Sequence, residues 1–317
     1  MNDRVDIVMA TYNGMPYIRE QLQSILWQDY PEFRLLIHDD GSTDGTVEEI
    51  RKVAKRYPDK VVFIEDGITF KDAKKNFEHL LKMTEADYIF LADQDDVWLP
   101  SKISRMVEAI KTLEDDKGSN FPLLAYSDYF TIDKQDDIIF PELVSKRKSW
   151  YSNITLNMQF ITGKLPGCAS GFNRSLLRIA LPFPDEAKWH DHWLSLVASA
   201  CGGLFHVPFT TTLYRIHDTN AIGVKPELTF QQRVRRWFAK FDDVVKGVIK
   251  QGEEAKGQAR ALLVRLESES YAMKDSTKMI EDFIEFCSGP FYTKLKLLKK
   301  FGDGDLPHNL ARALLWK

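Results

Sequence analysis

Apolar segments with the character of β-strands alternate with helix-like segments in the N-terminal part of the chain, and this alternation restricts the fold more than any other feature. The strand candidates are residues 5–10, 33–38, 60–66 and 87–93. Apolar residues recur at helical spacing between them, as in the stretch from Ile18 to Leu26. Strands joined by helices form right-handed crossovers in a mainly parallel sheet. The sequence therefore predicts an α/β fold with helices on both faces of the sheet.

The sequence changes character after this region. Residues 122–133 have the pattern of a further strand, residues 188–203 that of a helix, and residues 204–217 that of two strands separated by Pro208. Helices are then expected near residues 228–250, 252–274, 276–287 and 290–301. Residues 226–317 carry a net charge of +4 and the rest of the chain −7. We predict an α/β domain over residues 1–223 and a helical extension over residues 224–317.

Composition and charge exclude several classes of protein. The net charge of −3 gives no indication of nucleic-acid binding. No run of about 18 apolar residues predicts a membrane span, and the N-terminus lacks the apolar core of a secretory signal. The three cysteines, Cys168, Cys201 and Cys287, are far apart and have no metal-ligand spacing. These features predict a protein of a reducing compartment, the cytoplasm.

Polar loops follow three of the predicted strands. They read "TYNG" from Thr11, "DDGSTDGT" from Asp39 and "DQDD" from Asp93. In open α/β sheets, ligands bind outside the carboxyl ends of the strands, so we expect these loops to face one cleft. We also expect Thr46 to cap the helix that follows the second loop. The sequence contains neither G-x-G-x-x-G nor the P-loop motif, which disfavours dinucleotide and P-loop binding.

The carboxylates of the third loop have two interpretations. Asp93 and Asp95 are two residues apart, so in an extended chain both point to one side. Carboxylates on one side suit Mg²⁺ or Mn²⁺, with the phosphates of a nucleotide completing the shell. The alternative is an acidic turn before the next helix, and Asp96 is the member expected to cap that helix. In the second loop, Asp39 fits either a strand-to-helix turn or a carboxylate that accepts a pyrimidine N–H.

Two further segments carry candidate functional groups. In "WHDHW", Asp191 is either a helix N-cap or a general base within an apolar rim. Trp189 and Trp193 flank it, and each is either a sugar-stacking residue or a core residue. In "YRIHDTN", Arg215 could bind a phosphate, and His217 could complete the coordination of a metal ion.

Taken together and in order, these motifs resemble the family 2 glycosyltransferases, and most closely bacterial rhamnosyltransferases of cell-surface polysaccharide assembly. The motifs are "VMATYNG", "HDDGSTDGT", "LADQDDVW", "GCASGFNRSLL", "WHDHWLSLVASACGG" and "YRIHDTNAIG". The resemblance covers roughly residues 3–223. It implies the GT-A fold, a Rossmann-like α/β domain that binds a nucleotide-sugar donor. It also implies a divalent cation, Mn²⁺ or Mg²⁺, and inversion at the anomeric carbon.

The resemblance also implies roles for individual residues. Asp191 takes the place of the catalytic base, and His190 stands where most relatives have Glu, a variation that resembles the rhamnosyl-transferring branch. Trp189, His190 and Trp193 would lie near the sugar or acceptor. The implied metal ligands are Asp95 and His217. The implied donor-nucleotide contacts are Thr11, Tyr12, Asn13, Asp39, Asn76, Asp93 and Arg215.

The resemblance leaves substrate and partners open. The expected donor is dTDP-rhamnose, with a UDP-hexose as the alternative, and the expected acceptor is a glycan or lipid-linked glycan. The C-terminal segments mix basic and aromatic residues, which suits an anionic membrane surface, a self-association contact or packing on the α/β domain. Two other functions remain: a nucleotidyltransferase, which would be expected to have a Gly-rich loop and an activating lysine after the first strand, and a non-catalytic binding module.

Overall fold

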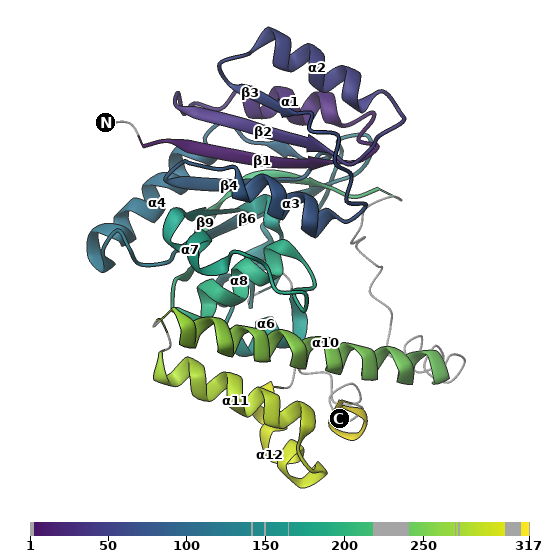
Figure 1. Cartoon of the computed structure of the whole chain (residues 1–317), viewed down its shortest axis with the longest axis vertical. Coiled ribbons are helices and arrows are strands. Elements are labelled where there is room, and N and C mark those ends of the chain that lie inside the picture. Colours follow the sequence, from purple (N-terminus) through teal and green to yellow (C-terminus); the bar gives the residue numbers. More distant parts are fainter. Residues whose placement is uncertain are drawn as a thin grey trace. The chain divides into compact units, whose positions relative to one another are not determined.

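A computed structural model gives the architecture of the chain (Figure 1). It describes residues 3–140, 142–148, 150–163, 165–217, 241–269, 271, 273–301 and 312–316. The chain divides into two compact units. Unit 1 comprises Met1–Ile154, Leu165–Phe183 and Trp189–His217, and unit 2 comprises Thr155–Lys164, Pro184–Lys188 and Asp218–Lys317. The domain boundary expected between residues 223 and 224 lies outside the described residues and stays a prediction.

The first half of the sheet in unit 1 is parallel, as the alternating pattern predicts. Its strands are β1 (Val5–Thr11), β2 (Phe33–Asp39), β3 (Val61–Ile64) and β4 (Tyr88–Ala92). They lie in the order β3-β2-β1-β4, and Thr11 is in register with Asp39. The carboxyl ends of these strands therefore meet at one edge, where the polar loops begin.

The second half of the sheet is mixed. Its strands are β5 (Val97–Trp98), β6 (Leu124–Ile132), β7 (Ile138–Phe140), β8 (Ser170–Asn173) and β9 (Leu204–Arg215). The sheet continues from β4 through β8, β6 and β9 to β5, with β8 antiparallel to both of its neighbours and β6 parallel to β9. The prediction of two strands in residues 204–217 was wrong. β9 is one strand whose register against β6 shifts after Val207, because Pro208 has no N–H for the ladder.

Helices cover both faces of this sheet. They are α1 (Ile18–Leu26), α2 (Thr46–Arg56), α3 (Ala73–Lys82), α4 (Lys102–Lys117), α5 (Val144–Arg147), α7 (Arg174–Ala180) and α8 (His190–Ala200). The helices α1, α2 and α4 bury apolar residues against Ile7 and Met9 on one face, whereas α3 packs on β1 and β2 from the other. Two short 3₁₀ turns, η1 (Tyr151–Asn153) and η2 (Gly167–Ala169), complete the described elements of unit 1.

The capping expected at the start of α2 was wrong. Gly45 is the N-cap residue, with a left-handed φ of 95° that favours glycine. The Thr46 hydroxyl instead donates to Asp44 Oδ1 at 2.6 Å and accepts from Gly14 N at 2.8 Å. Thr46 therefore joins the first and second polar loops.

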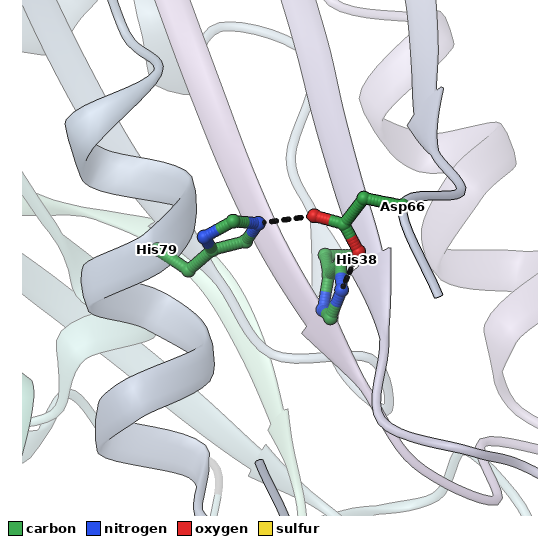
Figure 2. A group of neighbouring side chains, drawn as sticks. All are labelled: His38, Asp66 and His79. Carbon is green, nitrogen blue, oxygen red and sulfur yellow. Dashed lines mark hydrogen bonds and ion pairs between the residues drawn. The ribbon is translucent and has the colours of Figure 1, made fainter. Parts of the chain in front are cut away.

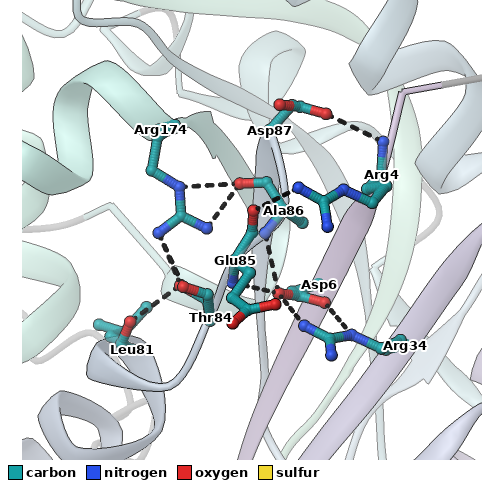
Figure 3. Close-up of polar contacts among 9 residues, drawn as sticks. All are labelled: Arg4, Asp6, Arg34, Leu81, Thr84, Glu85, Ala86, Asp87 and Arg174. Atoms are coloured by element: carbon teal, nitrogen blue, oxygen red, sulfur yellow. Dashed lines mark hydrogen bonds and ion pairs between the residues drawn. The ribbon is translucent and has the colours of Figure 1, made fainter.

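The opposite edge of the parallel strands is held by a separate polar cluster (Figure 3). Asp6, buried in β1, accepts two bonds from the Arg34 guanidinium at 2.9 and 3.0 Å and two from the backbone of the loop before β4. Arg174 donates to the carbonyl groups of Thr84 and Ala86 in the same loop. These bonds fix the start of β4, and hence the position of the loop of residues 93–96 at its other end, which we call the acidic loop.

Unit 2 is helical within the described residues. It contains α6 (Leu156–Thr162), α10 (Phe241–Ser268), α11 (Lys274–Ser288) and α12 (Phe291–Phe301). The helix break expected near residue 251 was wrong, since α10 runs through it. Gly252 lies against Trp316, where an added Cβ would come within 2.5 Å of the indole ring, so this glycine serves close packing and not a turn. The helix expected near 228–250 lies outside the described residues before Phe241.

Candidate functional site

The three polar loops meet through reciprocal hydrogen bonds. Gln94 accepts from Tyr12 N and donates to Tyr12 O, both at 2.9 Å, which joins the first loop to the third. Asn13 N donates to the Ser42 hydroxyl at 2.7 Å, and the Asn13 side chain accepts from Thr43 N at 2.9 Å, which joins the first loop to the second. The three loops therefore meet at one edge of the sheet, and the cleft expected there stays a prediction. Gln94 is the joining residue that the sequence did not reveal.

The Asp39 carboxylate holds the second loop in place through its hydrogen bonds. The Asp39 carboxylate accepts bonds from Thr11 Oγ1 at 2.7 Å, from Gly41 N at 3.1 Å, and from the N–H and hydroxyl of Ser42 at 2.7 and 2.6 Å. Thr11 is buried, whereas Tyr12 is 58% exposed. Because a carboxylate offers about four acceptor positions, a nucleobase N–H would have to replace one of these partners, and the Ser42 hydroxyl rotates most easily.

The acidic loop brings carboxylates together where Asp96 is buried and Asp93 and Asp95 are partly buried. Ligand atoms of Asp93, Asp96 and Cys168 all lie within 4.8 Å of one another. Burial, together with the carboxylates of Asp96, Asp95 and Asp191, raises the pKa of Asp93 well above its ordinary value. Burial and Asp95 raise the pKa of Asp96 to about 7. A divalent cation would offset this repulsion and favour the ionised carboxylates.

Asp96 does not cap a helix, contrary to expectation. The N-cap residue of α4 is Ser101, whose side chain makes no capping bond, and the amide oxygen of Gln28 accepts from Ile103 N at 3.1 Å in the first turn. Asp96 instead is buried and accepts from Arg215 N through Oδ1 at 2.9 Å. Its other oxygen, Oδ2, is buried without a hydrogen-bond partner. The nearby Cys168 thiol interacts with the Asp96 carboxyl and acts to lower its pKa, against the larger effect of burial, which raises it. Because a thiol is a weak donor, a cation could take its place next to this carboxylate.

Asp95 and His217, the two metal ligands that the resemblance implies, are in contact, and their role as ligands stays a prediction. His217 Nε2 is 2.8 Å from Asp95 Oδ2. The imidazole stacks on the Tyr17 ring, with 4.8 Å between centroids and 28° between planes. An oxygen and an imidazole nitrogen on the same side of the loop are suitable ligands for Mn²⁺.

Arg215 has a different environment from the one expected of a phosphate ligand. Its side chain is 1% exposed. The guanidinium donates to the carbonyls of Asp95 and Asp133 at 2.8 and 3.2 Å, to Glu20 at 2.6 Å, and to Asp136. In this structure Arg215 therefore holds the acidic loop, α1 and the β6–β7 turn together, and its N–H groups are committed to protein acceptors.

Asp191 belongs to the same electrostatic site as the acidic loop. It lies in the first turn of α8 and is not the N-cap, which is Trp189. Its Oδ2 accepts from Gly167 N at 3.2 Å and its Oδ1 from His192 N at 2.7 Å. Asp191 is one of the charges that raise the pKa of Asp93. The N-cap interpretation of Asp191 is therefore excluded, and the interpretation as a base in the site remains.

The aromatic neighbours of Asp191 divide into core and partly exposed residues. Trp193 is fully buried and donates from Nε1 to Ala180 O at 3.0 Å, so it is a core residue and not a sugar contact. His190 is also buried, stacked on Phe77 with 3.7 Å between ring centroids, and burial lowers the pKa of His190. Trp189 is partly exposed, which leaves it as the aromatic candidate for a sugar face.

Asn76 does not border the site as expected. It is 1% exposed. Its side-chain amide bonds the His38 imidazole at 2.8 Å and the His38 carbonyl at 3.3 Å. Asn76 is therefore a buried partner of His38.

Lys102 is the buried charge that sequence reasoning missed. It is fully buried in α4, donates to the carbonyl of Cys168 and to Thr212 Oγ1, and lies 3.8 Å from the centroid of the Trp98 ring. Burial lowers the pKa of Lys102 to about 8. The burial of Lys102 could have been predicted from helical spacing. Lys102 lies one turn before Met106 and two turns before Ile110, on the same buried face of α4.

Comparisons with known proteins identify relatives of this chain. The chain is 37% identical over 105 residues to the dTDP-rhamnosyl transferase RfbG of Shigella flexneri, which covers 32% of this chain and 36% of that protein. The chain thus matches only about a third of the length of this relative. It is 29% identical over 219 residues to WfaP of Escherichia coli, a UDP-Glc:alpha-D-GlcNAc-diphosphoundecaprenol beta-1,3-glucosyltransferase, covering 67% of this chain and 77% of that one.

A solved structure shares the fold. The mannosyltransferase PcManGT from Pyrobaculum calidifontis, in complex with GDP-Man and Mn²⁺, superposes with a TM-score of 0.51 at 17% identity, covering 99% of this chain and 87% of that one. This likeness confirms the expected GT-A fold of the sheet. A sequence model described as Glycosyl transferase family 2 matches residues 6–179, more than half of the chain. The chain belongs to glycosyl transferase family 2.

Proposed function

We propose that this protein transfers a sugar from a nucleotide-sugar donor to a glycan or lipid-linked glycan, in the assembly of a bacterial surface polysaccharide. The observation that carries this proposal is geometric: Asp191 Oδ2 accepts from Gly167 N at 3.2 Å, and the next residue, Cys168, has its sulfur within 4.8 Å of carboxylate oxygens of Asp93 and Asp96. A transferase needs such a proton acceptor close to the group that binds the diphosphate. Membership of glycosyl transferase family 2 supports the same reaction class.

The reaction is a direct displacement with inversion. Asp191 accepts the proton of an acceptor hydroxyl, and that oxygen attacks the anomeric carbon as the bond to the diphosphate breaks. Because attack comes from the side opposite the leaving group, Asp191 and the acidic loop flank the sugar. Tyr12, Asn13 and Asp39 hold the nucleoside, and Thr11 supports Asp39 through its hydroxyl. The Ser42 hydroxyl gives up its bond to Asp39 when the nucleobase binds.

The acidic loop would hold Mn²⁺ or Mg²⁺. Two groups of the loop could hold it: the paired Asp95 and His217, and the cluster of Asp93, Asp96 and Cys168. When bound, the cation supplies positive charge that neutralises the departing diphosphate. Arg215 positions Asp95 and Asp96 through their backbone and side-chain oxygens.

The donor we propose is dTDP-rhamnose. The replacement of the usual Glu by His190 beside Asp191 and the similarity to a dTDP-rhamnosyl transferase support this choice. A UDP-hexose is the alternative, and the similarity to a UDP-Glc-dependent glucosyltransferase favours it. The latter relative acts on a diphosphoundecaprenol-linked sugar, which supports a lipid-linked acceptor here.

The base role of Asp191 is tested by Asp191→Asn. The amide keeps one oxygen, for either the Gly167 or the His192 N–H, and does not act as a base. We therefore expect turnover to fall by a factor of about 10² or more, with donor binding retained. The matched control is Glu48→Gln, which changes an exposed acid in the first turn of α2. Retained turnover in Asp191→Asn would remove this residue from the mechanism.

Product analysis separates the rival functions. A glycosyltransferase releases a nucleoside diphosphate from its donor, whereas a nucleotidyltransferase releases pyrophosphate. A non-catalytic binding module would bind donor and release neither. We expect release of the nucleoside diphosphate only.

For helix α12 we propose contact with an anionic membrane surface. Phe291, Tyr292 and Leu295 are exposed beside the basic residues Lys296 and Lys299, a combination suited to the headgroup region. No helix among the described residues is long and apolar enough to cross a membrane.

In a sedimentation assay, the protein should pellet with vesicles that contain phosphatidylglycerol, and the double variant Lys296→Glu, Lys299→Glu should stay in the supernatant. Concentration-dependent dimerisation without vesicle binding would indicate the self-association contact instead.

A further inference from the structure

Two histidines and an aspartate from three elements converge near the second loop (Figure 2). His38 comes from β2, Asp66 from the segment after β3, and His79 from α3. His38 Nε2 lies 3.3 Å from Asp66 Oδ1, and His79 Nε2 lies 2.7 Å from Asp66 Oδ2. One ligand atom from each residue lies within 4.8 Å of the others. The three groups are distinct from the residues proposed for catalysis and donor binding.

The hydrogen bonds of Asn76 determine which nitrogen of His38 carries a proton. The Asn76 amide nitrogen donates to the His38 carbonyl at 3.3 Å, so its oxygen is the atom that faces His38 Nδ1 at 2.8 Å. That oxygen accepts only, so Nδ1 must be protonated. Nε2 of the neutral imidazole then carries a lone pair and points at a carboxylate oxygen of Asp66. Two acceptors face one another unless a proton or a metal ion lies between them.

The surroundings resemble those of a metal site more than those of a surface ion pair. The His38 side chain is 2% exposed, His79 19% and Asp66 28%. The ring of Phe70 lies 5.7 Å from that of His38 and 5.3 Å from that of His79, and provides an apolar wall. A ligating histidine typically donates its second N–H to an oxygen that orients the ring, and Asn76 provides this oxygen for His38.

The distances also suit a tetrahedral ion. Zinc bonds to nitrogen and oxygen are about 2.0–2.2 Å long, which places neighbouring ligand atoms about 3.3 Å apart. The separation of His38 Nε2 and Asp66 Oδ1 already has this value, whereas His79 faces the other oxygen of the carboxylate, Oδ2. The contact between His79 and Asp66 would open by about half an ångström, which the partly exposed His79 side chain allows.

We propose that His38, Asp66 and His79 bind a zinc ion. Two imidazoles and one carboxylate select zinc over Mg²⁺, and water would take the fourth position. The ion ties the end of β2 to the β3–α3 segment and to α3. Since His38 immediately precedes Asp39, the site stiffens the loop that carries the proposed nucleobase contact.

The experiment is equilibrium dialysis against Zn²⁺ with Mg²⁺ in large excess, followed by elemental analysis. Excess Mg²⁺ competes for the carboxylates of the acidic loop, and His217→Gln is dialysed alongside the wild type, because the imidazole of His217 belongs to the other proposed metal site and could also bind zinc. We expect one zinc per chain, and Co²⁺ in its place should give the intense visible absorption of tetrahedral cobalt. His79→Ala and Asp66→Asn should each weaken zinc binding by roughly tenfold or more.

The matched control is His206→Gln, which removes the imidazole of another histidine–aspartate pair, 3.2 Å from Asp128, and should leave zinc stoichiometry unchanged. Circular dichroism verifies that each variant is folded, and His79→Gln replaces His79→Ala if the latter is not. Absence of zinc from the wild-type chain, or unchanged zinc in the folded His79 and Asp66 variants, would overturn the proposal. Neither readout depends on transferase activity, so the proposed function is tested separately.

Discussion

At the scale of single residues, Arg215 illustrates how partners decide the role of a charged side chain. Sequence reasoning assigned it to a phosphate, because arginine in a polar loop commonly binds one. The structure buries it and gives its planar guanidinium acceptors in different directions, including Glu20 and Asp136. The planar guanidinium has five N–H donors that reach acceptors in several directions, whereas a lysine ammonium cannot reach all of them at once.

We therefore expect Arg215→Lys to destabilise unit 1 by about 2 kcal/mol, because the buried ammonium keeps the charge but cannot donate to acceptors that lie in four directions around the guanidinium. Urea denaturation followed by tryptophan fluorescence measures this change. Arg51→Lys is the matched control, since Arg51 forms an exposed pair with Glu65, and it should leave the unfolding midpoint unchanged. Equal midpoints for the two variants would show that the buried fork is not needed for stability.

At the scale of elements, the parallel strands and their loops could be predicted because burial on both faces leaves a continuous apolar pattern. The pairing of β8 between β4 and β6 could not, since long-range pairing leaves no local signal in a four-residue strand. The same limit applies to the site. The Asp-x-Asp pattern is visible along the chain, whereas the burial of Lys102 and the joining role of Gln94 depend on partners far away in sequence.

Glycines were the least predictable residues of the elements, because sequence does not reveal what surrounds them. Gly203, between α8 and β9, leaves no room for a side chain: an added Cβ would lie 1.8 Å from Pro122 O. Since that neighbour is backbone, β6 and β9 would have to separate at their start. We expect Gly203→Ala to cost about 3 kcal/mol in overpacking, measured by scanning calorimetry.

Gly247 provides the opposite case. It is exposed within α10, and an added Cβ would meet nothing within 4 Å. Gly247→Ala should stabilise the helix by about 0.5–1 kcal/mol. A loss of stability in Gly247→Ala comparable to that in Gly203→Ala would contradict the assignment of the Gly203 effect to close backbone packing.

At the scale of the whole molecule, donor and metal binding should be coupled, because the positive cation and the negative diphosphate would bind beside the same group of carboxylates. Asp93, Asp95, Asp96 and Asp191 repel one another without a cation, and a diphosphate adds further negative charge. A cation bound at Asp95 and His217 would offset both contributions. By linkage, each ligand then strengthens the binding of the other by the same factor.

Thermal denaturation with each donor, in Mn²⁺ or in chelator, measures this coupling. A ligand at about 100 times its Kd stabilises the folded chain by about 2.7 kcal/mol, so the preferred donor with Mn²⁺ should raise Tm by about 5 °C or more. We expect dTDP-rhamnose to exceed UDP-glucose and GDP-mannose, and chelator to remove most of the shift. Asp95→Asn should abolish the dependence on metal while leaving the Tm in chelator close to that of the wild type. If the donor shift were the same in chelator as in Mn²⁺, the diphosphate would be bound without the cation, and the acidic loop would need another role.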